Sequence, residues 1–491
     1  MVDDVDVVII GAGLSGIGAA CHLERNNPNK RYVILESREA MGGTWDLFRY
    51  PGVRSDSDMH TLGYAFKPWG AQKAIADGED ILAYIRETAT EYGVDSKIRY
   101  NQKVTAAQWH SESARWHLTI TCGDSGAITL RCRFVYSCTG YYSYDAGYMP
   151  DFEGVSDFGG RLLHPQVWPS DLDYSGQRVV VIGSGATAIA LVPAMAKTAG
   201  HVTMLQRSPT YIISLPAVDS GAERLRKWLP AMAAYWLTRW KNVSKQALIF
   251  YASRRYPEFA KRLLRKWVRL QLGDQFDLDK HFSPRYNPWD QRLCLVPNGD
   301  LFRALRKQTA SIVTDTISHF TATGIQLTSG EHLNADIVIS ATGLDLLPFG
   351  GIDFSVDGQA VKIPDTLAYK GMLLSGLPNL AVAIGYTNAS WTLKCDLTSD
   401  YVCRLLNHMD RHQYSYCVAQ HRDVDIATAP LLDFTSGYIT RAVDRFPRQG
   451  LRSPWRLRQN YLFDLLSLRF ASLTDSAIQF HRVPDVDRSP R

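Results

Sequence analysis

The chain has 491 residues, of which 45% are hydrophobic and 21% charged, and its formal net charge is +5. A chain of this length exceeds the size at which a single hydrophobic core stops growing, so we expect two or three domains. The composition is ordinary for a folded protein and by itself favours no particular activity.

The N-terminal segment and the cysteines favour a cytoplasmic protein. The sequence begins Met-Val-Asp-Asp-Val-Asp, with acidic residues where a secretory signal would carry positive charge. It contains no run of 18 apolar residues, which argues against a transmembrane helix. The eight cysteines form no C-x-x-C pair, so neither disulfides nor a metal site is expected, and a reducing compartment fits best.

The first nucleotide-binding signal lies near the N-terminus. Residues 5–10 (VDVVII) predict a buried parallel strand, a helical pattern follows, and residues 32–36 predict a second strand. Glu36 ends that second strand, where a carboxylate binds an adenosine ribose hydroxyl. The turn between the first strand and the helix permits a close approach to a pyrophosphate, and its cofactor-binding residues are Gly11, Gly13, Leu14, Ser15 and Gly16.

The same order of elements recurs in the middle of the chain. Strands are predicted at 178–182 and 201–205, and the second of them is followed by Arg207 and Ser208 instead of an acid. Arg207 can pair with a 2′-phosphate and Ser208 can donate to it, whereas a carboxylate would repel it. The pattern favours NADPH over NADH, although an exposed arginine at a strand end is also common. The turn that precedes the helix supplies Gly183, Ser184, Gly185, Ala186 and Thr187.

Two further predicted strands, 134–140 and 336–343, end in Thr-Gly and return the chain to the neighbouring domain. The predicted fold class is α/β, with two doubly wound Rossmann-like dinucleotide-binding domains and a helical insertion in the second. A chain with both sites is suited to passing a hydride from NADPH to a flavin. We expect an FAD-binding domain of residues 1–145 and 345–491, an NADPH-binding domain of residues 146–344, and the insertion at 212–285.

A longer pattern precedes the second nucleotide strand. Residues 157–169 (DFGGRLLHPQVWP) fit F-x-G-x-x-x-H-x-x-x-W-P, with the fixed positions Phe158, Gly160, His164, Trp168 and Pro169. This pattern resembles the fingerprint of the type I Baeyer–Villiger monooxygenases, which belong to the class B flavoprotein monooxygenases. The related N- and S-oxidising enzymes usually carry Tyr or Phe at the Trp position. The resemblance covers essentially the whole chain and is greatest to a mycobacterial subgroup that activates ethionamide, through residues 42–52, 287–299 and 385–394.

The resemblance implies an enzyme that uses FAD and NADPH to insert one oxygen atom from O₂ into a lipophilic ketone through a C4a-peroxyflavin. It also implies that Arg292 stabilises the peroxide anion and the oxyanion that follows, and that Asp56 orients this arginine beside the flavin. The better-known ketone oxidisers carry Lys immediately before that arginine, whereas this chain has Gln291. The flavin-contacting residues implied by the same resemblance are Gly43, Thr44, Trp45 and Asp56.

Two other functions remain open. The same oxygenating site could act on sulfides, thioamides or amines, as an S- or N-oxygenating flavin monooxygenase does. A reductase or disulfide oxidoreductase also pairs FAD with NADPH, but that class needs a C-x-x-C or C-x₄-C pair near the flavin, and the sequence has neither. Nucleic-acid binding has no motif behind it, and the sequence does not fix the oligomeric state.

The predicted insertion is strongly basic. Residues 221–270 hold 13 Lys and Arg against two Glu, a net charge of +11, interleaved with Trp228, Trp236, Trp240 and Trp267. Basic helices rich in Trp can lie on anionic membrane surfaces, which would give a cytoplasmic protein a peripheral membrane contact. The other interpretation is a helical lid packed over the active site, with a solvated basic face that binds the acidic remainder or a second subunit.

Overall fold

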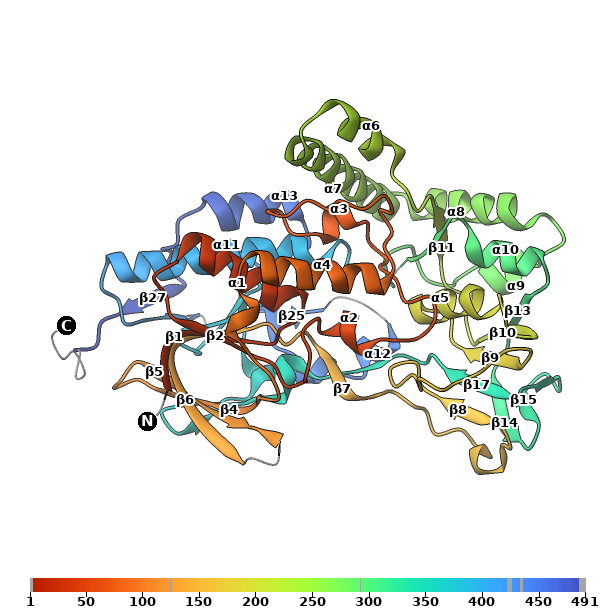
Figure 1. Ribbon diagram of the computed structural model, residues 1–491, viewed down its shortest axis with the longest axis horizontal. Coiled ribbons are helices and arrows are strands. Elements are labelled where there is room, and N and C mark those ends of the chain that lie inside the picture. The colour runs from red at the N-terminus through yellow and green to blue at the C-terminus, as the bar shows by residue number, and fades with distance from the viewer. Residues whose placement is uncertain (1–2, 124–125, 292, 422–425, 433–435, 485–491) are drawn as a thin grey trace.

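The computed structural model describes residues 3–123, 126–291, 293–421, 426–432 and 436–484. Its strands gather into two main sheets, one of eleven strands and one of five, each with helices packed against it (Figure 1). Each main sheet contains a strand–glycine turn–helix–strand unit at the expected place. The predicted α/β class with two Rossmann-like units is therefore confirmed.

The larger sheet carries the first glycine turn. Its centre is the parallel run β3–β2–β1–β6–β23, in which the apolar residues of β1 are buried between two neighbouring strands. The strands of this sheet are β1 (Asp3–Ile10), β2 (Tyr32–Leu35), β3 (Ile98–Arg99), β4 (Lys103–His110), β5 (Arg115–Thr121), β6 (Ala127–Ser137), β19 (Asp353–Val356), β20 (Gln359–Ala360), β21 (Ala368–Tyr369), β22 (Leu373–Leu374) and β23 (Leu380–Val382).

An antiparallel meander extends the larger sheet beyond β6. Strand β5 pairs antiparallel with both β4 and β6, and its side chains alternate between buried and half-buried positions. The doubly wound scheme predicted from the sequence does not contain this meander. That prediction rests on glycine-rich phosphate-binding turns, and the strands of the meander do not follow such turns.

The C-terminal third of the chain returns to the larger sheet. Strand β19 pairs in parallel with β4, and β23 pairs in parallel with β6. Helix α11 (Trp391–Arg411) packs along α1 (Leu14–Asn26), and α4 (Gly78–Glu91) lies against the other side of α1 (Figure 1). Side chains of α1 and α11 meet through polar contacts, among them one of 3.3 Å between the imidazole of His22 and the carboxylate of Asp396.

The smaller sheet is parallel throughout, in the order β13–β10–β9–β17–β8. Helices α5 (Ala186–Met195) and α10 (Asp300–Arg306) pack on it. Its strands are β8 (Arg161–Leu163), β9 (Arg178–Ile182), β10 (His201–Gln206), β13 (Ala310–Thr314) and β17 (Ile337–Ser340), and an accessory antiparallel sheet holds β14 (Ile317–Thr321), β15 (Gly324–Leu327) and β16 (His332–Asn334).

The chain passes between the two main sheets at two segments that lie side by side. The first crossing is β7 (Tyr142–Gly147) and the second is β18 (Leu344–Leu346). These two strands pair antiparallel, so the two crossings form one ribbon.

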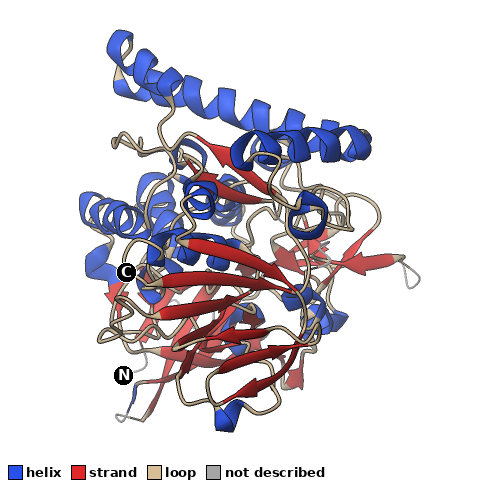
Figure 2. Cartoon of the chain, turned by 90° about the vertical axis from the view of Figure 1, so that its right-hand side faces the viewer, coloured by secondary structure: helices blue, strands red, loops and turns tan. Residues whose placement is uncertain are grey.

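The helical insertion lies between β11 (Ile212–Leu215) and β12 (Cys294–Pro297), which pair in parallel. Its helices run along one edge of the molecule (Figure 2). None of the helices in the described ranges is both long enough and apolar enough to cross a bilayer. The insertion consists of α6 (Ser220–Trp228), α7 (Ala231–Arg255), α8 (Pro257–Leu272) and α9 (Leu278–Phe282).

Short elements complete the fold. Their bounds are α2 (Thr44–Leu47), α3 (Met59–Leu62), α12 (Gly437–Thr440), α13 (Tyr461–Asp464) with a π-helical turn over Leu465–Phe470, and the antiparallel pairs β24 (Tyr416–Ala419) with β27 (Ile478–His481) and β25 (Thr428–Pro430) with β26 (Arg448–Gly450).

Candidate cofactor and active site

A cavity of about 1210 Å³ is lined by residues that follow strands of both main sheets. The structure thus brings the two glycine turns and the predicted flavin-contacting segment to one space. The predicted site residues on its wall are Gly11, Gly13, Leu14, Ser15, Glu36, Gly43, Thr44, Trp45, Asp56, Gly183, Ser184, Gly185, Ala186, Thr187, Arg207 and Ser208.

The first glycine turn joins β1 to α1 with no room for side chains. Gly11 has φ +101°, and a Cβ there would lie 2.8 Å from the carbonyl oxygen of Cys138. Gly16 lies behind the cavity wall, where a Cβ would approach the Gly11 carbonyl oxygen to 1.8 Å. Because α1 begins at Leu14 on the cavity wall, its unpaired N–H groups are placed to bind a pyrophosphate.

Glu36 is held beside this turn. Its side chain is buried, and its carboxylate accepts the N–H of Ala12 at 2.8 Å and the N–H of Arg38 at 2.9 Å. These bonds fix the carboxylate at the cavity wall. A fixed anion in this position can accept hydrogen bonds from ribose hydroxyls and repels a 2′-phosphate.

The predicted flavin-contacting segment lies directly against the first turn. Gly13 and Gly42 form a parallel bridge, and a Cβ on Gly43 would lie 3.0 Å from the Cα of Gly13. Thr44 begins α2 and contacts the phenol of Tyr144, whose pKa is raised to about 12 by burial. Close contact between the two loops leaves the space beside them open to a dinucleotide.

The second glycine turn has the same geometry with a wider opening. Gly183 has φ +137°, and a Cβ there would lie 2.5 Å from the Ala341 carbonyl oxygen. At Gly185, no atom of the described residues lies within 4 Å of an added Cβ, and the residue lines the cavity. A side chain at Gly185 would occupy the space beside the N-terminus of α5, where a pyrophosphate fits.

The cation predicted to bind a 2′-phosphate lies beside the second turn. Arg207 and Ser208 are exposed at the end of β10 and line the cavity. The hydroxyl of Ser184 donates to the carbonyl oxygen of Ser208 at 3.1 Å, which ties this segment to the turn. An exposed guanidinium next to a pyrophosphate cradle is suited to recognising NADPH.

The structure describes one of the two residues implied as catalytic. Asp56 lines the cavity, and so does Gln291, the residue before Arg292. Arg292 itself lies outside the described residues. Asp56 and Gln291, the sequence neighbour of Arg292, therefore line the same cavity as both glycine turns.

The segment that precedes Asp56 is anchored on the smaller sheet's side of the molecule. The ring of Tyr50 belongs to the hydrophobic core that includes α5 and α10. A Cβ on Gly52 would lie 2.6 Å from the carbonyl oxygen of Ala190 in α5. Arg54 pairs with Asp300 at the start of α10, at 2.5 Å. This loop of the larger sheet is thus fixed by contacts with the smaller one.

None of the five fingerprint residues, all of which lie in described ranges, lines the cavity. Phe158 packs edge-on against Phe320, with ring centroids 5.7 Å apart, and Trp168 packs on the core of the smaller sheet. A Cβ on Gly160 would lie 2.4 Å from the carbonyl oxygen of Asp336. Pro169 accepts a backbone hydrogen bond in the turn that follows. Phe158, Gly160 and Trp168 therefore pack against the smaller sheet and its accessory strands, away from the cavity wall.

His164 is the member of the fingerprint that contacts both crossings. Its Nε2 donates to the carbonyl oxygen of Gly343 at 2.9 Å, and its Nδ1 accepts the N–H of Gln166 at 3.2 Å. A Cβ on Gly147, at the end of β7, would lie 1.9 Å from the imidazole ring. Burial lowers the pKa of His164, which favours the neutral form that this pattern of hydrogen bonds requires.

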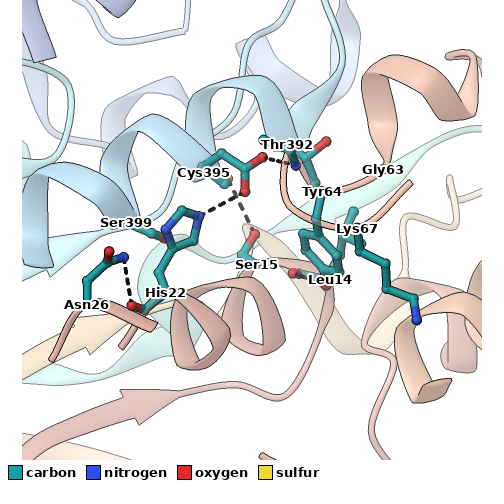
Figure 3. A network of polar contacts seen from close by, with 12 residues as sticks. Leu14, Ser15, His22, Asn26, Gly63, Tyr64, Lys67, Thr392, Cys395 and Ser399 are labelled. Carbon is teal, nitrogen blue, oxygen red and sulfur yellow. Dashed lines mark hydrogen bonds and ion pairs between the residues drawn. The ribbon is translucent and has the colours of Figure 1, made fainter. Parts of the chain in front are cut away.

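Some residues on the cavity wall carry no individual signal in the sequence. Trp391 lines the cavity at the start of α11 and donates from Nε1 to the hydroxyl of Ser15 at 2.8 Å. Ser15 also lies 3.5 Å from the sulfur of Cys395, one turn further along α11 (Figure 3). Arg441 stacks on Tyr148 at 3.6 Å, and both line the cavity. Contacts between residues this far apart cannot be predicted from a pattern within a short stretch of sequence.

The chain is similar to known proteins over its whole length. Residues 8–214 match the family described as pyridine nucleotide-disulphide oxidoreductase. The chain is 54% identical over 486 residues to the FAD-containing monooxygenase EthA of Mycobacterium tuberculosis (strain H37Rv), covering 99% of each chain. It is 51% identical over 482 residues to EthA of Mycolicibacterium smegmatis, covering 98% of each.

Solved structures share the fold. An oxidized steroid monooxygenase bound to NADP superposes with a TM-score of 0.78 at 22% identity, covering 98% of this chain and 100% of that one. Cyclohexanone monooxygenase from Rhodococcus sp. Phi1 bound to NADP⁺ superposes with a TM-score of 0.71 at 21% identity, covering 86% and 87%. The identity to EthA over almost the full length shows that the chain belongs to the family of FAD-containing monooxygenases.

Proposed function

We propose that this chain is a Baeyer–Villiger monooxygenase that uses FAD and NADPH to insert one atom of O₂ into lipophilic ketones, giving esters or lactones. One observation carries the proposal: the two glycine turns open into a single cavity, and the side chains at their ribose ends, Glu36 and Arg207, carry opposite charges. Glu36 disfavours a 2′-phosphate and Arg207 attracts one, so two different dinucleotides can meet in that cavity.

The first turn and its neighbours fit FAD. The N-terminus of α1 binds the pyrophosphate, Glu36 accepts from the ribose, and the loop of Gly43 and Thr44 positions the flavin ring. FAD, once bound and reduced, supplies the electrons with which O₂ is activated. The half-buried ring of Trp391 lines the cavity beside the turn, where it is placed to limit the access of water.

The second turn fits NADPH. The N-terminus of α5 binds its pyrophosphate in the open space at Gly185, and Arg207 with Ser208 binds its 2′-phosphate. Both turns lie on one cavity, so the nicotinamide can reach the flavin without leaving the protein. The steroid and cyclohexanone monooxygenases that share the fold were solved with NADP, which supports this assignment.

Arg292 and Asp56 are proposed to act on the ketone. A guanidinium keeps its proton at every physiological pH, so Arg292 can stabilise the negative charge that develops on the carbonyl oxygen. Asp56 would accept from that guanidinium and hold its direction. The cavity position of Asp56 and of Gln291 supports the pair, as does the ketone in the name of cyclohexanone monooxygenase.

Product analysis tests the proposal. The FAD-loaded protein should be supplied with NADPH, O₂ and a panel of linear, cyclic and aryl ketones together with one sulfide. We expect an ester or lactone, with one NADPH and one O₂ used for each molecule formed. A wild-type enzyme that yields only the sulfoxide would instead be an S- or N-oxygenating flavin monooxygenase.

Variants of Arg292 test its assignment separately. Losing one preorganised donor to an oxyanion costs about 10²–10³ in rate, so Arg292→Ala should lose ester formation while NADPH is still oxidised and hydrogen peroxide is released. Asp56→Ala should show a milder loss, because the arginine remains but is poorly directed. Arg285→Ala, at an exposed position nearby, is the matched control and should keep full coupling. Wild-type coupling in Arg292→Ala would contradict the assignment.

A further inference from the structure

We propose that the outer face of the helical insertion binds the surface of an anionic lipid bilayer. The observation lies on α8, where Phe259, Leu263, Trp267 and Leu270 are exposed by 63%, 37%, 45% and 72%. Their spacing of four, four and three residues places them in one stripe along the helix. A continuous exposed stripe of large apolar side chains marks an interaction surface. This inference does not depend on the reaction that the cavity performs.

The stripe is not the face by which α8 packs in the protein. Ala260, Val268 and Leu272 are buried, and the last two belong to the core of the smaller sheet. Val268 and Leu272 lie about a quarter of a turn or more from the stripe, and Ala260 lies between the stripe and the packed face. The helix therefore has one apolar face for the protein and a second that the described part of the chain leaves exposed.

Positive charge borders the stripe. Arg262 and Lys266 are exposed on the same helix, at positions next to Leu263 and Trp267. Residues 221–270 together carry a net charge of +11. A narrow apolar stripe with basic residues at its border is the arrangement by which helices lie in the headgroup region of anionic bilayers.

Exposed apolar side chains also lie on α7 and α6. Leu237 and Leu248 are exposed on α7, on the same helical face as Lys241 and Lys245. Trp228 at the end of α6 is exposed by 86%. Figures 1 and 2 place α6, α7 and α8 along one edge of the molecule.

Two basic residues of the insertion hold it to the rest of the protein and so cannot touch a membrane. Arg226 donates to the carbonyl oxygens of residues 69–71. Arg239 is buried, donates to the carbonyl oxygens of His60 and Gly63 at 2.9 and 2.8 Å, and lies 3.5 Å from the carboxylate of Asp396. The insertion is thus packed on one side, as the lid interpretation expects, and presents its apolar residues on a fixed support.

The combination of positive charge and apolar side chains on this face favours an anionic bilayer over other partners. A second copy of this chain docking by the same face would bring two basic surfaces together, because a twofold interface pairs a patch with itself. A nucleic acid would satisfy the positive charge but offers little apolar surface to a row of Phe, Leu and Trp side chains. An anionic bilayer satisfies both parts of the surface.

Vesicle sedimentation of the FAD-loaded enzyme tests the proposal. Vesicles of phosphatidylcholine alone are compared with vesicles of equal parts phosphatidylcholine and phosphatidylglycerol, across a salt series. We expect binding to the anionic vesicles at low salt that weakens as ionic strength rises. The variant Phe259→Ser/Trp267→Ser should lower the partition coefficient by about tenfold or more, because the apolar stripe loses its two largest side chains.

Matched variants complete the design. Ile128→Ser/Leu451→Ser removes exposed apolar side chains elsewhere and should bind as the wild type does. Arg262→Glu/Lys266→Glu should abolish binding, whereas Lys97→Glu/Lys197→Glu makes the same change in net charge at exposed sites away from α8 and should reduce it far less. Unchanged flavin content and thermal midpoint show that each variant is folded.

Three results would overturn the proposal. The first is wild-type protein that does not sediment with anionic vesicles at any salt concentration. The second is equal sedimentation of the wild type and the stripe variant. The third is a wild-type oligomer, seen by light scattering without vesicles, that dissociates in the stripe variant, since the face would then bind a second copy.

Discussion

The Nε2 of His164 lies 2.9 Å from the carbonyl oxygen of Gly343, so the fingerprint segment is hydrogen-bonded to the second crossing between the two sheets. The same imidazole lies against Gly147 at the end of the first crossing. One side chain thereby fixes the ribbon through which the two nucleotide-binding units are joined. Its position, away from the cavity wall, indicates a structural role.

This arrangement predicts a pH dependence of stability. Burial lowers the pKa of His164 below its ordinary value of about 6.5, so the unfolded chain binds a proton more readily than the folded one. The stabilisation is therefore present above about pH 6.5 and is lost as pH falls below it. Urea unfolding should show that the advantage of wild type over His164→Gln shrinks between about pH 7 and pH 5. Parallel pH profiles for the two proteins would contradict the assignment.

Substitutions in the two glycine turns should have reciprocal effects. Gly13→Val places a side chain beside the first pyrophosphate site, so the protein should purify without its yellow colour and still bind NADP⁺. Gly185→Val fills the open space of the second turn, so FAD should be retained while NADP⁺ binding weakens by about tenfold or more. Flavin absorbance and NADP⁺ titration calorimetry measure the two effects. Loss of FAD in both variants would mean that the turns do not form separate sites.

Arg207 should set the nicotinamide preference. Losing one charge-assisted hydrogen bond costs roughly 1.5–3 kcal/mol, so Arg207→Ala should raise the Michaelis constant for NADPH by about ten- to a hundredfold. NADH has no 2′-phosphate and serves as the internal control, for which kinetics should change little. The two constants are measured by flavin reduction. An unaltered NADPH/NADH ratio would rule out this role.

Arg239 should be needed for stability. Replacing this buried arginine with Met leaves the Asp396 carboxylate without one of its partners and removes a donor from the carbonyl groups of His60 and Gly63. Removing one member of a buried ion pair costs roughly 3–5 kcal/mol of unfolding free energy. Lys245→Met, on an exposed turn of the same helix, is the control and should change stability by about 0.5 kcal/mol or less. Equal effects in the two variants would show that Arg239 does not anchor the insertion.

The nucleotide-binding units could be predicted from the sequence because each is a local pattern. The turn at Gly11, the strand before it and Glu36 lie within a few dozen residues, and each is required by backbone geometry or by the ligand. The same holds for Gly183 and Arg207. The antiparallel meander was not predicted, since alternating half-buried strands are stabilised by pairing with neighbours that the local pattern does not identify.

The rest of the cavity depends on contacts between distant segments. Nothing near Trp391 indicates that it bonds to Ser15, and nothing near Gly52 indicates that it touches α5. The basic insertion shows most directly what the sequence alone does not predict. Its sequence presents Arg226 and Arg239 as equivalent to the exposed basic residues. Only packing shows that these two bind backbone carbonyls of residues outside the insertion.

The contact between Ser15 and Trp391 spans 376 residues, which has a consequence for synthesis of the protein. At ribosomal speeds of about 5–20 residues per second, roughly 20–75 s separate the emergence of the first glycine turn from that of the residue that covers it. For nearly all of this interval the larger sheet also lacks β23, the strand that pairs with β6 beside β1. We therefore expect flavin to load only after α11 has been made, so a chain truncated before α11 should contain both glycine motifs but remain colourless.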